Sequence, residues 1–429
     1  MIGKEIHNFA TSLWPINRSL TGEGVRETLL AIKEHIPDLN IFEVKTGTKA
    51  FDWTVPKEWK INDAWIMDPE GKKICDFTDN NLHLVGYSHS INKKLKLSQL
   101  KKNLFFLKDQ PEAVPYVTSY YNKTWGFSMS YNEYKNLKEG IYQVVIDSKL
   151  FNGKLDYGEL IFKGKSKKEI LLSTYICHPS MANNEISGIS LLTFLSKFII
   201  SQKRFYTYRI IFIPETIGSI MYIKKNLSIL KKRTEAGYIL TCIGDERNYS
   251  ILPSRNGDTI SDKIGLHIIK WTDQNFKMHS WSERGSDERQ FCAPGVDLPI
   301  SSLMRTKYGC YPEYHTSLDK LGSVVTEKGL KDSLNFVTNI IKAFENNYYL
   351  TNKILCEPNM GKRGLYPILS KKGSINYKTK IMMEILTWAD GKHSVLDVAE
   401  ILNVPIWELY DSIKILLREN LIKVDMKKS

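Results

Sequence analysis

The sequence predicts an α/β protein with a mixed central sheet flanked by helices, accompanied by two smaller domains. The main reason lies in residues 149–350, where continuous apolar runs alternate with helical patterns, as buried strands and their covering helices do. Residues 41–148 differ, because short alternating runs separated by turn residues predict a small β-rich domain. After residue 358, three helical patterns predict a third domain.

Residues 1–40 are predicted to be helical and to form one core with residues 149–350. The segment Glu23–His35 has apolar residues at helical spacing, and Pro37 ends it. Residues 41–148 would then be an insertion into this core. The alternating runs of the insertion are Ile41–Lys45, Ala64–Met67 and Leu84–Tyr87.

Four runs in the core have the continuous apolar character of strands that are covered on both faces. They are Glu169–Ile176, Tyr208–Ile213, Ala236–Ile243 and Leu298–Leu303. A long helix is predicted over 186–201, directly after the first run. In such a sheet ligands collect at the carboxyl ends of the strands, so the polar residues that follow each run are candidate site residues.

Residues 358–429 are predicted to form a winged-helix domain. A Pro/Gly/Lys linker over 358–369 precedes helices at 380–389, 394–402 and 405–420 and one short strand at 421–425. Ser394 and Asp397 are placed to cap the middle helix. The last helix carries Glu and Asp as well as Lys and Arg, whereas duplex DNA requires cations. We therefore expect this domain to bind a protein or a second copy of the chain rather than nucleic acid.

Composition favours a soluble, cytoplasmic protein. Hydrophobic residues make up 42% of the chain, which allows a large core, and no apolar run is long enough to span a membrane. The N-terminus has no hydrophobic leader, and none of the six cysteines forms a CxxC pair. The net charge of +13 comes mainly from dispersed lysines, so it does not predict a nucleic-acid or membrane partner.

Polar residues that zinc accepts as ligands follow the predicted core strands. His178, Glu215 and Asp245 follow the first three runs, and His315 lies in the later segment Tyr311–Asp319. Neutral imidazole and carboxylate groups at successive strand ends can converge on one metal ion. Because the sequence has no GxGxxG, P-loop or GxSxG motif, nucleotide and serine-hydrolase chemistry are not expected.

The order of these residues resembles that of the co-catalytic zinc aminopeptidases. Four longer motifs are similar to those of bacterial zinc peptidase-like proteins with an aminopeptidase-like domain. The motifs are Leu13–Gly22, Cys177–Ser180, Gly285–Cys292 and Tyr311–Ser317. Proteins of that group carry an inserted β module and a C-terminal winged helix, and many appear in surface-polysaccharide loci. The resemblance covers essentially the whole chain and implies a zinc-aminopeptidase-like mixed sheet.

The resemblance implies roles for individual residues. His178, Asp245 and His315 match metal ligands, and Glu215 matches the general base that takes a proton from water. Tyr314 belongs to the matching Tyr-His-Thr motif and is expected to contact substrate.

Two carboxylates of the resembling family are missing. Asn184 stands where a bridging Asp belongs, with Glu185 beside it as a candidate replacement, and Thr216 replaces a glutamate ligand. A neutral amide does not balance two dications, so we expect a single zinc ion, or none at physiological concentration.

Two functions from different classes remain open. The first is a zinc-dependent amide hydrolase acting on a small peptide or on an aminosugar or amino-acid conjugate, in surface-polysaccharide biosynthesis. The second is a non-catalytic binding or scaffold protein, which Asn184 and Thr216 favour. Asp287 and Arg289 either shape the substrate pocket or form an ion pair that braces a loop.

Overall fold

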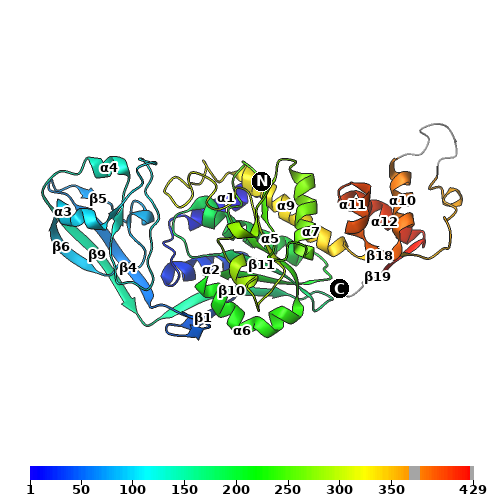
Figure 1. Cartoon of the computed structure of the whole chain (residues 1–429), viewed down its shortest axis with the longest axis horizontal. Coiled ribbons are helices and arrows are strands. Elements are labelled where there is room, and N and C mark those ends of the chain that lie inside the picture. The colour runs from blue at the N-terminus through cyan, green and yellow to red at the C-terminus, as the bar shows by residue number, and fades with distance from the viewer. Residues whose placement is uncertain (367–376, 426–429) are drawn as a thin grey trace. The chain divides into compact units, whose positions relative to one another are not determined.

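A computed structural model describes residues 1–366 and 377–425 (Figure 1). The chain divides into two compact units. Unit 1 comprises Met1–Asp262 and Asn275–Asn335, and unit 2 comprises Lys263–Gln274 and Phe336–Ser429. Within the described ranges, no helix has both the length and the apolar character that a membrane span requires.

Unit 1 contains a mixed eight-stranded sheet in the order β1-β10-β12-β11-β13-β16-β14-β15. The four strands at its centre run parallel, and they are β11 (Glu169–Tyr175), β12 (Thr207–Ile213), β13 (Thr234–Leu240) and β16 (Ile300–Met304). The flanking strands are β1 (Asn40–Lys45), β10 (Lys154–Phe162), β14 (Ser250–Leu252) and β15 (Lys277–Met278). Every residue of β11 and β12 is buried, as their continuous apolar sequence predicts. The predicted α/β class with a mixed sheet is confirmed.

Helices cover both faces of this sheet. Helix α5 (Ser187–Ser201) connects β11 to β12, and α6 (Ile217–Arg233) connects β12 to β13, in the opposite direction across the sheet. Figure 1 shows α5 and α6 on opposite sides of the sheet, as right-handed crossovers require. The N-terminal helices are α1 (Ile2–Leu13) and α2 (Glu23–His35), and α1 packs against α5.

Most of the β-rich part of unit 1 is an antiparallel four-stranded sheet in the order β5-β4-β9-β6. Its strands are β4 (Glu58–Met67), β5 (Lys73–Ile74), β6 (Ile91–Lys96) and β9 (Ile141–Phe151). The run Ile41–Lys45 lies instead in β1, paired with β10 of the large sheet. Leu84–Tyr87 forms isolated bridges, from Leu84 to Phe127 and from Gly86 to Thr118, and no extended strand. Alternation alone cannot show which sheet a short strand joins.

Unit 2 contains the three predicted C-terminal helices and a three-stranded sheet in the order β18-β17-β19. The helices are α10 (Tyr377–Trp388), α11 (Val395–Leu402) and α12 (Trp407–Arg418), and the strands are β17 (Tyr349–Asn352), β18 (Asp390–Ser394) and β19 (Ile422–Asp425). Ser394 and Asp397 form the expected capping box of α11. The sheet begins at Tyr349, before the predicted linker, because β17 pairs with both other strands. Residues 367–369 of that linker lie outside the described residues.

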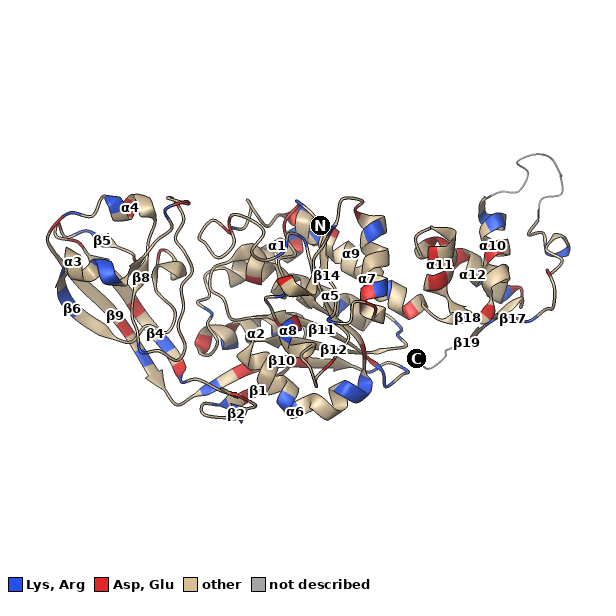
Figure 2. Cartoon of the chain, in the orientation of Figure 1, with Lys and Arg blue, Asp and Glu red and all other residues tan. Residues whose placement is uncertain are grey.

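The helices of unit 2 carry charges of both signs. Figure 2 shows acidic residues on α11. On α12, the Lys414 ammonium lies 3.0 Å from Asp411, and the Arg418 guanidinium lies 3.4 Å from Glu419. The basic side chains of this helix therefore have acidic neighbours of their own.

One buried histidine fastens α7 (Ile260–Thr272) to the C-terminal helices inside unit 2. Nε2 of His267 accepts the backbone N–H of Ile406 at 2.9 Å, and Nδ1 donates to the carboxylate of Glu400. Burial lowers the pKa of His267 below its usual value, although Glu400 acts in the opposite direction. Both ring nitrogens thus have protein partners.

Candidate metal and catalytic site

The candidate site lies where the central parallel strands of unit 1 end. His178 follows β11, and Glu215 follows the neighbouring strand β12. Because parallel neighbours end at the same edge of a sheet, the two side chains meet, with Nε2 of His178 3.8 Å from a carboxylate oxygen of Glu215.

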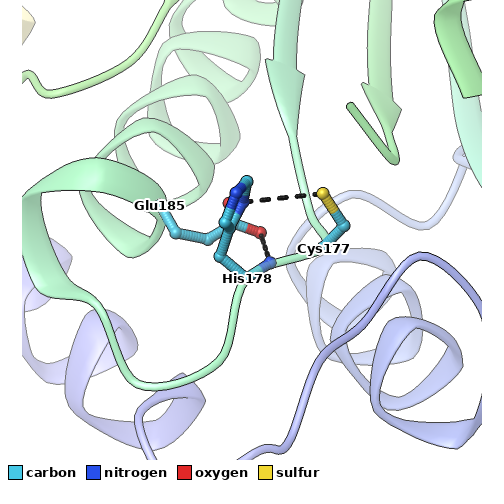
Figure 3. A group of neighbouring side chains, drawn as sticks. All are labelled: Cys177, His178 and Glu185. Carbon is cyan, nitrogen blue, oxygen red and sulfur yellow. Dashed lines mark hydrogen bonds and ion pairs between the residues drawn. The ribbon is translucent and has the colours of Figure 1, made fainter. Parts of the chain in front are cut away.

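Glu185 orients the His178 ring. One oxygen of this fully buried carboxylate accepts the backbone N–H of His178 at 2.9 Å, and the other accepts the ring Nδ1–H at 2.8 Å (Figure 3). Glu185 lies in a π-helical turn, Ala182–Ile186, directly before α5. With Nδ1 carrying the proton, Nε2 keeps its lone pair on the Glu215 side, which is the arrangement typical of metal-binding histidines.

The surroundings of His178 favour positive charge on its ring. Burial lowers the pKa of this imidazole, but the neighbouring groups of Cys177 and Glu185 outweigh burial and raise the pKa well above its usual value. An imidazole in such surroundings favours a proton or a metal ion at Nε2. Glu185 therefore supports a cation through His178 without touching it.

Cys177 is a supporting residue in this geometry. Its sulfur lies 3.5 Å from Nδ1 of His178 and accepts the backbone N–H of Glu215 at 3.2 Å. Ligand atoms of Cys177, His178 and Glu185 lie within 4.8 Å of one another, which is compatible with metal binding by distance alone. However, the Glu185 oxygens are already used by His178, and burial raises the pKa of Cys177 to about 11. A protonated thiol is neither a good zinc ligand nor a nucleophile.

His315 lies at the same site, beside His178. The ring centroids of His178 and His315 are 5.6 Å apart, and Nε2 of His315 lies 3.2 Å from the side-chain oxygen of Asn184. The His315 ring also stacks on Tyr314, with centroids 3.9 Å apart. Burial, followed by the nearby His178, lowers the pKa of His315 to about 3. This imidazole is therefore neutral, as a metal ligand must be.

The β-rich segment of unit 1 holds the His315 loop in place. The backbone N–H of Tyr116 donates to the carbonyl of His315 at 2.9 Å, and Val114 exchanges hydrogen bonds with Ser317. The Tyr116 ring lies 5.4 Å from the His178 ring and 5.3 Å from the His315 ring, between centroids. His315 itself has a left-handed backbone (φ 56°), which these contacts stabilise. Sequence reasoning missed Tyr116, because aromatic residues in a β-rich segment usually pack in its core.

Asp245 does not join the two imidazoles. One oxygen accepts from Asn183 Nδ2 and Thr306 N, and the other accepts from Thr306 Oγ1 and Arg247 N, all at 2.9 Å. Four donors fill the acceptor capacity of a carboxylate. The strand β13 ends at Leu240, and the left-handed turn at Cys242 (φ 47°) comes before Asp245. A position five residues beyond a strand end need not face the site, which the sequence alone does not reveal.

The residue that follows β13 at the site is Thr241. Its hydroxyl donates to the backbone carbonyl of Asn184 at 3.0 Å and also hydrogen-bonds to the Tyr175 hydroxyl. The Tyr175 hydroxyl in turn accepts from the side-chain amide of Asn184 at 3.2 Å. A neutral hydroxyl network therefore surrounds Asn184.

Asp287 and Arg289 flank the turn that presents Glu215. A carboxylate oxygen of Asp287 accepts the backbone N–H of Thr216 at 2.8 Å, and Arg289 donates to the Thr216 hydroxyl at 2.9 Å. Thr216 has a strained backbone (φ 63°), which these two contacts hold. Burial, followed by the charge of Glu215, raises the pKa of Asp287 to about 8, and burial also raises the pKa of Glu215. No direct pair between Asp287 and Arg289 is found among the described contacts.

The donor set at this site fits one zinc ion. His178 and His315 each offer an imidazole nitrogen and Asn184 offers a neutral amide oxygen, with the Glu215 carboxylate 3.8 Å from Nε2 of His178. A second ion would need further carboxylates. Thr216 and Thr241 occupy positions beside the site, and Asp245 is fully engaged elsewhere.

Two protein families match this chain, one over the core region and one over the C-terminal region. Residues 7–347 match a family described as a domain of unknown function, DUF4910, and residues 347–424 match a winged helix-turn-helix family. A relative from Clostridium acetobutylicum, provisionally named a polysaccharide biosynthesis protein with an aminopeptidase-like domain, is 43% identical over 398 residues, covering 92% of this chain and 91% of the relative.

Two solved structures are also similar. A crystal structure from Clostridium acetobutylicum, provisionally described as a peptidase, aligns with a TM-score of 0.93 at 41% identity, covering 99% of this chain and 96% of that one. A zinc aminopeptidase from Bacillus subtilis aligns with a TM-score of 0.56 at 13% identity, covering 80% of this chain and 94% of that one. The predicted aminopeptidase-like fold and winged helix are confirmed.

Proposed function

Because the chain belongs to the DUF4910 family and has the aminopeptidase fold, we propose that it is a hydrolase of amide bonds that uses a single zinc ion. The name of the Clostridium acetobutylicum relative supports a substrate from polysaccharide biosynthesis. We accordingly propose an aminosugar or amino-acid conjugate, or a small peptide, as the substrate class.

The observation that carries this proposal is the approach of Glu215 to His178. Nε2 of His178 lies 3.8 Å from the Glu215 carboxylate, while Nδ1 is fixed by Glu185. His178 and His315 would hold the zinc ion, with the Asn184 oxygen as a weaker ligand. When bound, the zinc would supply Lewis acidity toward the amide carbonyl and the attacking water.

Glu215 has the environment of a general base. Burial raises its pKa, which brings the carboxylate closer to the range in which it can accept a proton and return it near neutral pH. It would take a proton from the attacking water and give it to the leaving amine. Two hydrogen bonds fix the backbone that carries Glu215. Cys177 accepts the N–H of Glu215, and Asp287 accepts the N–H of Thr216.

A non-catalytic binding protein is the second candidate. Asn184 and Thr216 favour it, because an amide and a hydroxyl replace two carboxylates of the related aminopeptidases. The hydrolase is preferred because the base and both imidazoles still converge.

Glu215→Gln separates the two functions. Wild type and variant would be assayed with zinc on a panel of aminoacyl and N-acyl-aminosugar amides, and their bound zinc would be measured by mass spectrometry. We expect Glu215→Gln to keep the zinc and to lose about 10²–10⁴-fold in turnover, which is the usual contribution of a general base. The matched control is Glu70→Gln, which removes an exposed carboxylate paired with Lys138. If wild type and Glu215→Gln turn over every substrate equally slowly, the hydrolase is excluded and the binding protein takes its place.

A further inference from the structure

We propose that Arg18 is a positioning residue for the metal site, acting through Glu185 on His178. It would keep the His178 ring oriented so that Nε2 remains available to zinc. The inference rests on the proposed function only in taking zinc as the ion.

Arg18 reaches the site from the loop between α1 and α2. Its side chain is fully buried, and its Nε donates to the backbone carbonyl of His178 at 3.0 Å. Nη1 donates to the carbonyl of Leu13 at 2.8 Å, which anchors the guanidinium to the end of α1. Nε also lies 3.9 Å from a carboxylate oxygen of Glu185, whose side chain is equally buried.

These contacts form a continuous line from Arg18 through Glu185 to His178. Glu185 accepts hydrogen bonds from the backbone N–H and the ring Nδ1–H of His178, and Arg18 donates to the backbone carbonyl of the same residue. His178 is therefore held at three polar atoms, which are its backbone N–H, its backbone carbonyl and its ring Nδ1, and these contacts leave Nε2 unused. Outer partners of this kind fix the orientation of a metal-binding histidine.

Charge gives Arg18 a second role. A buried carboxylate without a cation nearby is strongly unfavourable, and Arg18 supplies that cation for Glu185. Arg18 therefore stabilises the buried Glu185 carboxylate that accepts the Nδ1–H of His178.

A purely structural role explains Arg18 poorly. Within the described part of the chain, Nη2 of Arg18 is buried and has no hydrogen-bond partner. Replacing a whole buried ion pair by apolar residues of similar volume is often neutral for stability, whereas removing one partner leaves the other charge uncompensated. An apolar side chain at position 18 would fill the same space, but it could neither hold His178 nor balance Glu185.

The test is a double-mutant cycle on zinc affinity in the full-length protein. Zinc affinity would be measured by chelator competition for wild type, Arg18→Met, Glu185→Gln and the double variant. We expect each single variant to bind zinc about 10–100-fold more weakly, as changes of outer partners do. If Arg18 acts through Glu185, the double variant is no weaker than Glu185→Gln alone.

Arg305→Met is the matched control. Arg305 is also buried, donates from Nε to a backbone carbonyl (of Asn248, at 2.7 Å) and has an unpartnered Nη1. Its loss should leave zinc affinity unchanged. If circular dichroism shows that Arg18→Met does not fold, Arg18→Lys takes its place. Lys keeps the positive charge but lacks the several guanidinium donors, so this variant should still bind zinc more weakly than wild type.

The inference is overturned if the Arg18 variant that folds binds zinc as wild type does, or if the two single effects add in the double variant. It is also overturned if Arg305→Met weakens zinc binding equally. Failure of the hydrolase proposal looks different, because zinc affinity would still depend on Arg18 while no substrate of the panel is turned over.

Discussion

Two buried histidines, one in each unit, each face a glutamate through Nδ1 and differ at the other ring nitrogen. In both pairs Nδ1 faces a glutamate, which is Glu185 for His178 and Glu400 for His267. Nε2 of His267 accepts a backbone N–H, whereas Nε2 of His178 faces the Glu215 carboxylate 3.8 Å away. The pair alone therefore does not distinguish a candidate metal site from a structural histidine, and the partner of the second nitrogen is the difference between the two.

The two pairs also differ in how strongly the glutamate acts. The Glu185 side chain is 0% exposed and the Glu400 side chain is 48% exposed, so water screens the charge of Glu400. Burial lowers the pKa of both rings, but the net shift is upward for His178 and downward for His267. Buried counter-charge thus prepares one ring for a cation and leaves the other neutral.

The largest contrast is expected from removing each ring. His178→Ala should weaken zinc affinity by more than about 100-fold, because a zinc ligand is lost. A change of an outer partner weakens the affinity by at most about that factor. His267→Ala should keep wild-type zinc affinity but lose about 1–3 kcal/mol of stability, since the Ile406 N–H is left unpaired. Metal analysis and urea unfolding of both variants measure this. Equal zinc loss in the two variants would remove the distinction between the pairs.

Removing zinc should sharpen the comparison in the wild-type protein. At a free concentration of 100 times Kd, zinc stabilises the state that binds it by about 2.7 kcal/mol. Chelation should therefore speed hydrogen exchange in peptides around His178 and His315 and leave peptides of α7 and α12 unchanged. Exchange followed by mass spectrometry, with and without chelator, gives the answer. Uniform acceleration across both units would contradict a zinc site confined to unit 1.

The smallest effect concerns pH. The folded pKa of His267 lies below its unfolded value of about 6.5, so the folded state binds fewer protons at acid pH. The contribution of His267 is complete above pH about 6.5 and is lost as pH falls toward the folded pKa, at up to about 1.4 kcal/mol per pH unit. Urea unfolding from pH 7.5 to 5 should show this slope in wild type but not in His267→Gln. Identical slopes would mean that His267 does not titrate differently on folding.

Periodicity and motif order in the sequence were enough to predict the buried strands and the residues that directly follow them. Continuous apolar runs located β11 and β12, and the residues directly after them, His178 and Glu215, meet in the structure. The capping pair Ser394 and Asp397 was equally local and is confirmed. That the winged helix binds a protein or a second copy stays a prediction.

What the sequence could not predict depends on distant contacts. Asp245 follows its strand by five residues and turns to Thr306 and Asn183, which no motif indicates. Arg18 touches His178 although 160 positions separate them, a contact that no local pattern indicates. Glu185 was considered as a ligand, yet its oxygens bind the N–H groups of His178.

The distances along the chain bear on when the site can form during synthesis and folding. Arg18 and His178 are 160 residues apart, and Val114 and Ser317, which clasp the His315 loop, are 203 apart. Closing such long loops loses much chain entropy before any contact is gained, so these connections belong to the slow, late part of folding. In a nascent chain the hydrogen bonds between Val114 and Ser317 cannot form until Ser317 has left the ribosome. Under the proposed function, zinc binding would therefore be a late event, open to a nearly folded chain and not to its early intermediates.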